Sequence, residues 1–276
     1  MSMKTISFVF LVLAVLCAGC KNNPVFPSET QVVLQGYLYA SEPVRDISLA
    51  SSFAIGSSDS TQTPISNASV TLIKNSTRYQ LSPNGAQPGY YQYGGSDLSV
   101  NTGDDFRIEV DYDGQVITAE TIVPPKPEQL ALSVNTLRFQ TDSVQSRFGA
   151  RTRINGLDTA LVTWSNPAGE YYYVVIESID PNRQLIRPDT LFTRRFVSEP
   201  TNQAVYRIND NTILYTGRHV LRLYHVNKEY ADLFRSRVQD SRALNEPLTN
   251  VNNGLGIFSA FASDSLFFSV TLHLSR

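Results

Sequence analysis

Alternating apolar and polar residues in the first half of the chain predict a series of β-strands. Apolar side chains occupy every second position of residues 106–112, so they would share one face of a strand. Asp113-Gly114 follows directly and separates this stretch from another strand pattern at 115–123, which is a strong signal for a β-hairpin with a two-residue turn. Similar strand patterns occur at residues 32–39, 68–74 and 90–93.

The second half of the chain repeats the strand pattern and adds one stretch with helical spacing. Tyr230, Leu233 and Phe234 lie three and four positions apart, which places them on one face of a helix. Asn227 precedes this stretch and is a residue type that caps helix N-termini. We therefore expect one sizeable helix near 227–242, with its apolar face packed on the core. Strands are expected at 160–165, 171–178, 218–226 and 265–274.

A proline-rich stretch divides the two halves. Pro124, Pro125 and Pro127 would stiffen the backbone and interrupt strand pairing, so we place a domain boundary there. The expected fold is mainly β, with two β-sandwich domains at 31–124 and 125–276, the second of which carries the inserted helix.

The N-terminus has the features of a bacterial export signal. Lys4 provides a positive charge, residues 6–16 form an apolar stretch that is too short to span a membrane, and small residues precede Cys20. Cleavage before Cys20 would make 1–19 a lipoprotein signal peptide, with Cys20 as the lipid acceptor. The alternative is an ordinary secretory signal that is cut near Gly19, because Cys17 departs from the usual lipoprotein pattern.

The cysteine content favours lipidation. The two cysteines are Cys17 and Cys20, so removal of residues 1–19 leaves one, and no internal disulfide can form. Acylation would turn this thiol into a membrane anchor, because each buried methylene contributes about 0.8 kcal/mol of membrane affinity. We expect a lipidated tether at 20–30 and a location at the outer membrane, with both its periplasmic and its cell-surface face left open.

Composition and charge argue against several classes of function. The formal net charge is −2 at pH 7 and no basic stripe occurs, so nucleic acid is not an expected partner. His219 and His225 would share a strand face, but six residues of strand separate them by about 20 Å, which is too far for one metal ion. No nucleophile motif or dinucleotide loop is found. We therefore expect a protein without catalytic residues, metal or cofactor.

Five Asp-Ser and Asp-Thr pairs form a recurrent motif. In each pair an aliphatic residue or Thr follows, which resembles the O-glycosylation acceptor motif of exported Bacteroidota proteins. The same pairs are also typical of loop ends that precede strands. The sequence favours neither interpretation, and the candidate acceptors are Ser60, Ser143, Thr159, Thr190 and Ser265.

Runs of tyrosine suggest a binding surface. Successive strand residues point to opposite faces, so the tyrosines at 90–93 and at 171–173 cannot all face one core. Tyr91, Tyr93 and Tyr172 are therefore candidates for binding a sugar, a peptide or a partner protein. The competing interpretation is a strand that is buried on both faces.

Several motifs together resemble a known family. PISNASV at 64–70 and PGYY at 88–91 resemble small immunoglobulin-like, prealbumin-like modules, whereas Trp164 with the strand at 171–176 resembles a fibronectin type III domain. NEPLTNVNNGLGIFSA at 245–260 is the most specific piece. In this order, behind a lipidation signal, the motifs look like a Bacteroidota lipoprotein family that is defined by domain of unknown function 4249.

The resemblance implies an outer-membrane lipoprotein, often encoded beside TonB-dependent receptors, and it implies no catalytic residues. We therefore expect a lipid-anchored cell-envelope protein that acts as a non-enzymatic binding or accessory subunit of a TonB-dependent outer-membrane receptor. Its N-terminal lipid would bind the membrane. The alternatives are a stand-alone surface module that binds glycans or peptides and, less favoured, an unrecognised hydrolase.

Overall fold

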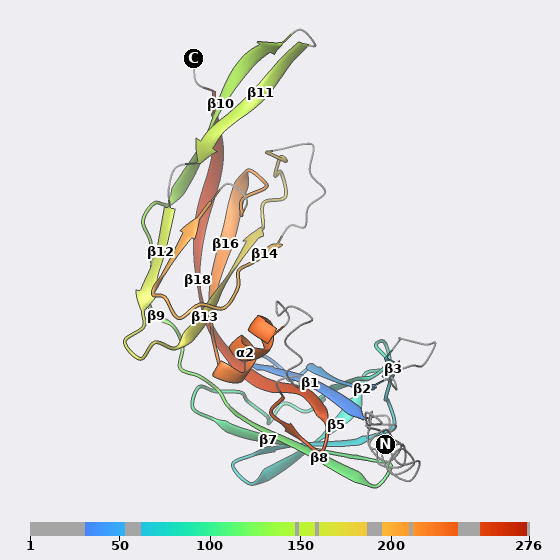
Figure 1. The fold of residues 1–276 in the computed structure, drawn as a ribbon. Coiled ribbons are helices and arrows are strands. Elements are labelled where there is room, and N and C mark those ends of the chain that lie inside the picture. The colour runs from blue at the N-terminus through green and yellow to red at the C-terminus, as the bar shows by residue number, and fades with distance from the viewer. Residues whose placement is uncertain are drawn as a thin grey trace, which may run out of the picture.

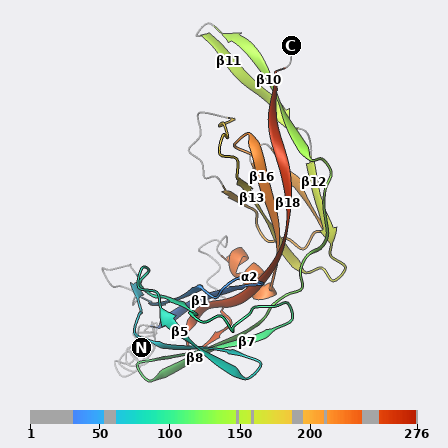
Figure 2. The same ribbon diagram turned by 180° about the vertical axis from the view of Figure 1, so that it is seen from behind.

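The chain folds into two β-modules that meet at an angle, with helix α2 (Lys228–Ser236) in the corner between them (Figures 1 and 2). The computed structural model describes residues 31–52, 62–146, 149–157, 160–186, 195–209, 212–236 and 249–274. Strands dominate these residues, which confirms the expectation of a mainly β fold.

The first module is a sandwich of two sheets. Strands β1, β2, β3 and β6 form one layer, and β4, β5, β7, β8 and β17 form the other. Its core contains fully buried side chains from both layers, such as Leu34, Leu72 and Phe106. The strands are β1 (Val32–Tyr39), β2 (Asp46–Ser51), β3 (Thr63–Pro64), β4 (Ser69–Lys74), β5 (Thr77–Pro83), β6 (Tyr90–Gln92), β7 (Asp105–Tyr112), β8 (Gln115–Ile122) and β17 (Val251–Asn252).

The β7–β8 hairpin confirms the strongest local pattern in the sequence. Tyr112 pairs with Gln115 across a two-residue turn, and both turn residues, Asp113 and Gly114, have positive φ angles of 50° and 78°. Two positive φ angles are the geometry that matches the twist of a tight hairpin, and Asp-Gly adopts it readily. The alternating apolar residues of β7 point into the core as expected.

The second module is also a sandwich. A three-stranded sheet in the order β15-β12-β9 packs on a layer that contains β14, β13, β16, β18 and β10. Trp164 and Tyr172 lie in the core between the layers. The strands are β9 (Glu128–Leu132), β10 (Thr136–Ser146), β11 (Gly149–Leu157), β12 (Ala160–Ser165), β13 (Tyr171–Ser178), β14 (Arg195–Val197), β15 (Val205–Ile208) and β16 (Gly217–Val226).

Strand β18 (Leu255–Leu274) belongs to both modules. Its first part pairs in parallel with β1, and its middle part pairs antiparallel with β16. Phe258 and Ala260 of β18 consequently lie in the core of the first module, together with Val251 of β17, which pairs with β8. The expected division at 124 and 125 assigned these residues to the second domain, because local patterns carry no information on which distant strand a chain end will join.

Helix α2 begins at Lys228, close to the expected start, and residues 237–242 of the expected helix lie outside the described part of the chain. The side chain of Asn227 also reaches the first module. Its Nδ2 donates hydrogen bonds to Thr121 Oγ1 and to the backbone oxygen of Ile122, both at 2.9 Å. Asn227 therefore ties the helix start to β8 of the other module.

An aromatic joint fixes the angle between the modules. Phe261, at the bend of β18, stacks on Tyr39 at a centroid distance of 5.1 Å and meets the edge of Tyr230 from α2 at 4.9 Å. Tyr173 stacks on Tyr224 within the same cluster at 4.9 Å. Burial raises the pKa of Tyr39 and of Tyr173 above the ordinary value, so both phenols stay neutral at physiological pH.

Candidate functional site

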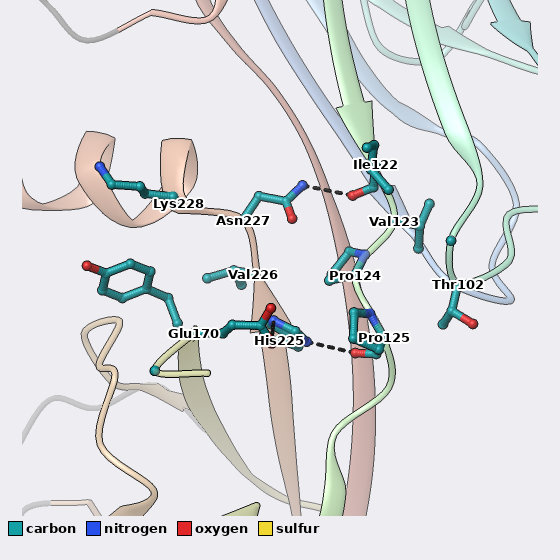
Figure 3. A pocket seen from close by; sticks show the side chains of 13 residues that line it. Thr102, Ile122, Val123, Pro124, Pro125, Glu170, His225, Val226, Asn227 and Lys228 are labelled. Atoms are coloured by element: carbon teal, nitrogen blue, oxygen red, sulfur yellow. Dashed lines mark hydrogen bonds and ion pairs between the residues drawn. The ribbon is translucent and has the colours of Figure 1, made fainter. Parts of the chain in front are cut away.

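A crevice lies between the two modules, beside the start of α2 (Figure 3). Its volume is about 670 Å³, which is within the range of small-molecule and peptide pockets. We call it the inter-module crevice. It is lined by Thr102, Gly103, Ile122, Val123, Pro124, Pro125, Gly169, Glu170, Tyr171, His225, Val226, Asn227 and Lys228.

The crevice has an apolar wall at the end of β8. Ile122 is 58% exposed although it is a large aliphatic residue, and the linker residues Pro124 and Pro125 follow it (Figure 3). Val226 of β16 and Tyr171 of β13 line the wall of the second module. An exposed isoleucine that faces prolines and a tyrosine offers apolar contact area to a ligand.

The polar part of the crevice is built around a buried histidine. His225 Nδ1 lies 2.8 Å from the backbone oxygen of Pro125, and its Nε2 lies 3.1 Å from Glu170 Oε2. The imidazole ring also stacks on Tyr172 at a centroid distance of 4.5 Å. His225 therefore holds the linker on one side and orients the carboxylate of Glu170, whose side chain is 46% exposed, on the other.

Two smaller hollows lie beyond the crevice; the first adjoins it, and the second adjoins the first through Glu229 and Asn250. The first, of about 460 Å³, shares Ile122, Asn227 and Lys228 with it and is otherwise lined by polar residues that include Asp105 and Glu120. The second hollow, of about 110 Å³, continues along α2. The hollows extend the crevice into an elongated, acidic surface between β8 and α2.

Asparagine side chains close the edge of β8 beside these hollows. Alternate backbone carbonyls of a strand point to the same side, and β17 covers only the middle of β8. Beyond β17, side-chain amides take the place of a neighbouring strand. Asn253 bonds to the oxygen of Val116 at 3.1 Å, Asn250 to that of Glu120 at 3.4 Å and Asn227 to that of Ile122 at 2.9 Å.

The segment that carried the family resemblance therefore has a structural role. Asn250 accepts a hydrogen bond from the backbone nitrogen of Phe258 at 2.9 Å and donates one to the backbone oxygen of the same residue at 2.7 Å. Gly256 has a φ of +111°, and a Cβ there would lie 1.9 Å from the backbone oxygen of Leu34. These residues seat β18 against β1 and keep the hollow open on its β8 side.

Two of the expected binding tyrosines are core residues. Tyr91 is fully buried, and its hydroxyl donates to the oxygen of Ile65 and accepts from the nitrogen of Ala68, both at 3.0 Å. Tyr172 is also buried, behind His225. Both side chains point into a sandwich core, so neither offers a surface to a ligand. Strand β13 is buried on both faces, as the competing interpretation proposed, whereas Tyr90 on the other face of β6 is exposed.

The other candidate residues lie apart from the crevice. Tyr93 is half-buried in the first module, and its hydroxyl donates to Asp97 Oδ1 at 2.6 Å. Ser265 is exposed on β18. Cys20, Ser60, Thr159, Thr190 and the side chain of Ser143 lie outside the described part of the chain.

The two histidines of β16 are buried. His219 stacks on Phe268 at 5.2 Å, its Nδ1 lies 3.0 Å from the oxygen of Gly217, and burial lowers its pKa. Within the described ranges, no group of three or more His, Cys, Asp or Glu side chains could hold a metal ion. In the same ranges, no helix is long and apolar enough to cross a membrane.

Sequence reasoning missed the crevice because its walls come from four separate segments. Ile122 counted as an ordinary strand residue and the prolines as a linker. The signal that could have been used is the position of an aliphatic residue directly before a proline pair, where a strand ends and one face becomes exposed.

Comparisons with known proteins agree with the resemblance noted in the sequence. A family described as domain of unknown function (DUF4249) matches residues 22–266. No curated protein matches the chain. Among solved structures, the crystal structure of the chicken CNTN1 FN1-FN3 domains has 8% identity over 83% of this chain and 67% of that chain, with a TM-score of 0.16, which is too low to carry an argument.

Proposed function

Since the chain belongs to the family described as domain of unknown function (DUF4249), we propose that it is a non-enzymatic, lipid-anchored binding protein of the bacterial cell envelope. In this proposal Cys20 carries the lipid, the outer membrane is the anchoring membrane, and the chain is an accessory subunit of a TonB-dependent receptor. The partner or its ligand binds in the inter-module crevice.

The observation that carries the proposal is the shared construction of the crevice. Ile122 comes from the first module, Glu170 and His225 come from the second, and β18 with the aromatic joint connects the two modules. A site whose two walls are held by one continuous strand is pre-organised, and pre-organisation lowers the entropic cost of binding. Domain junctions are also a common place for binding sites.

The anchor is supported by the sequence around Cys20. A lone cysteine that follows small residues and an apolar stretch fits lipidation, and the tether at 20–30 would separate the modules from the membrane. Growth with an alkyne-tagged fatty acid tests this part directly. The wild-type chain should become labelled and partition with membranes, whereas Cys20→Ser should carry no label; equal labelling of the two would contradict the anchor.

The accessory role is tested by purification from native membranes in mild detergent. We expect a TonB-dependent receptor to be enriched with the tagged wild-type chain and to be lost with Ile122→Asp, which places a charge on the apolar wall. Val116→Asp is the matched control, because Val116 is 51% exposed on the same strand and does not line the crevice. Absence of any receptor from the wild-type sample would contradict the role.

A stand-alone binding module is the second candidate, favoured by the pocket-like volume of the crevice. It would bind glycans or peptides without a receptor, and a glycan array with the purified chain distinguishes it from the accessory role.

O-glycosylation of Ser60, Ser143, Thr159, Thr190 or Ser265 is a further proposal, supported by the recurrent Asp-Ser/Thr motif and by the exposure of Ser265. An intact mass without added hexose would contradict it.

A further inference from the structure

We propose that the inter-module crevice recognises an extended segment of a partner protein in which cationic side chains alternate with apolar ones. This inference rests on the proposed function and names the chemistry of the ligand at the same site. It follows from three features: the apolar wall, the charge of the crevice and the hollows, and the β8 edge, whose carbonyl groups are already hydrogen-bonded.

The apolar wall is the first part of the argument. Ile122 and Pro125 line the crevice from the end of β8 and the linker (Figure 3), and Tyr171 lines it from the second module. Burial of one leucine-sized side chain between them would contribute about 1.5–3 kcal/mol. An aliphatic side chain of the ligand fits this wall, whereas a fully polar segment would leave it unused.

Charge is the second part. Glu170 stands at the crevice with its carboxylate partly exposed, and its Oε2 lies 3.1 Å from Nε2 of the buried His225. Lys228 is the one cationic side chain besides His225 that lines the crevice and the two hollows, and it pairs with Asp232 one turn along α2. A lysine or arginine of the ligand would therefore share the carboxylate of Glu170 with His225.

The adjoining hollows extend the same preference along the ligand. Their lining adds the carboxylates of Asp105, Glu120, Glu229 and Asp232. Arg107 lies 3.8 Å from Glu120 and Arg235 lies 3.7 Å from Asp232, so two of the four are partly balanced. Glu170 and Lys228 balance each other in the crevice itself, but carboxylates outnumber cationic side chains in the lining of both hollows, which favours a ligand with further positive charge beyond the one at Glu170.

The closed edge of β8 determines which groups of such a segment can be recognised. A free edge would bind any extended chain through backbone hydrogen bonds, with little dependence on sequence. Here the carbonyl groups of Glu120 and Ile122 already accept hydrogen bonds from Asn250 and Asn227. The ligand must therefore be selected by its side chains, and charge and apolarity should dominate the affinity.

The test uses fluorescence anisotropy with the purified chain and three labelled heptapeptides. The basic peptide is Gly-Leu-Arg-Leu-Lys-Leu-Gly, and the other two replace both cations by glutamine or by glutamate. We expect the basic peptide to bind about tenfold more tightly than the glutamine peptide, which is what about 1.4 kcal/mol of charge interaction provides. Binding of the glutamate peptide should be weaker still.

Two variants and one control variant locate the binding. Glu170→Gln keeps an acceptor for His225 and should weaken the basic peptide about fivefold while leaving the glutamine peptide unchanged, because only the charge is removed. Ile122→Ser should weaken both peptides, and Val116→Ser, an equally exposed position of β8 outside the crevice, should weaken neither. Circular dichroism and thermal unfolding of each variant confirm that it is folded.

The inference is overturned if the basic and glutamine peptides bind equally, if no peptide binds, or if Ile122→Ser and Val116→Ser behave alike. Such a result does not decide the proposed function, which is tested separately by purification from native membranes. Recovery of a receptor with the wild-type chain but not with Ile122→Asp would retain the crevice as the binding site while the ligand chemistry fails. Tight binding of the basic peptide, together with the absence of any receptor in the sample from native membranes, would support the ligand chemistry and contradict the accessory role.

Discussion

Asn250→Ala should weaken the attachment of β18 to the first module, which the pairing with β1 would still maintain. In the wild-type chain the amide of Asn250 pairs with both backbone groups of Phe258 and bonds to the carbonyl of Glu120. Phe258 is fully buried in the wild-type chain, where this amide is the partner of both its backbone groups. The substitution therefore leaves a buried N–H and a buried C=O of the backbone without a hydrogen bond.

The magnitude follows from these contacts. Two well-formed hydrogen bonds contribute about 0.5–1.5 kcal/mol each, and an unsatisfied buried group costs about 1–3 kcal/mol. We expect a loss of about 2–4 kcal/mol in the free energy of unfolding. For a chain of this size, each kcal/mol lowers the melting temperature by about 2–4 °C, so the expected decrease is about 5–15 °C.

Urea denaturation of the purified chain, followed by tryptophan and tyrosine fluorescence, measures this difference. Asn252→Ala is the matched control, because its amide makes a single exposed contact of 3.5 Å with Thr118 Oγ1. It should cost less than about 0.5 kcal/mol. If Asn250→Ala unfolds within about 0.5 kcal/mol of the wild-type chain, the amide does not hold β18 as described.

Three further predictions concern the core. Gly256→Ala should destabilise the chain by more than about 3 kcal/mol, because the added Cβ would clash with a backbone oxygen. Gly103 also has a positive φ but lies in open space, so Gly103→Ala should cost about 1 kcal/mol. Thermal unfolding of the two variants measures the difference. Tyr91→Phe should cost about 1–2 kcal/mol in urea, and no loss would mean that its buried hydroxyl is not hydrogen-bonded. Burial lowers the pKa of His219, so the unfolded chain takes up a proton near pH 6.5 while the folded chain does not, and stability should fall as the pH drops below about 6.5. Urea midpoints measured between pH 7.5 and 5 should show this fall, and it should be smaller in His219→Phe; an unchanged slope would contradict the assignment.

Local patterns predicted the parts of the fold that depend on local chemistry. Asp113-Gly114 specifies its hairpin because two neighbouring residues with positive φ set the geometry. The pairing of β18 with β1 could not be predicted in this way, because it joins the two ends of the chain and no local pattern selects a distant strand. For the same reason, residues 251–260 were expected in the second domain, whereas Val251, Phe258 and Ala260 lie in the core of the first module.

The candidate site shows the same division. Tyr91 and Tyr172 were selected as surface aromatics, yet each points into a sandwich core, and which face of a strand a second layer covers is a tertiary property. Asn227 was expected only as a cap of α2, and the sequence did not show that the approach of β8 gives its amide nitrogen two hydrogen-bond acceptors in the other module. Glu170 and Ile122 become a site only when the two modules meet.

The central claim is that a partner docks in the inter-module crevice, and site-specific photo-crosslinking in native membranes tests it most directly. A photoreactive amino acid at position 122 probes the crevice, and the same group at position 116 probes an equally exposed point of β8 outside it. The account predicts a crosslink from position 122 to a TonB-dependent receptor and none from position 116. Absence of a crosslink at position 122, or equal crosslinks at both positions, would contradict it.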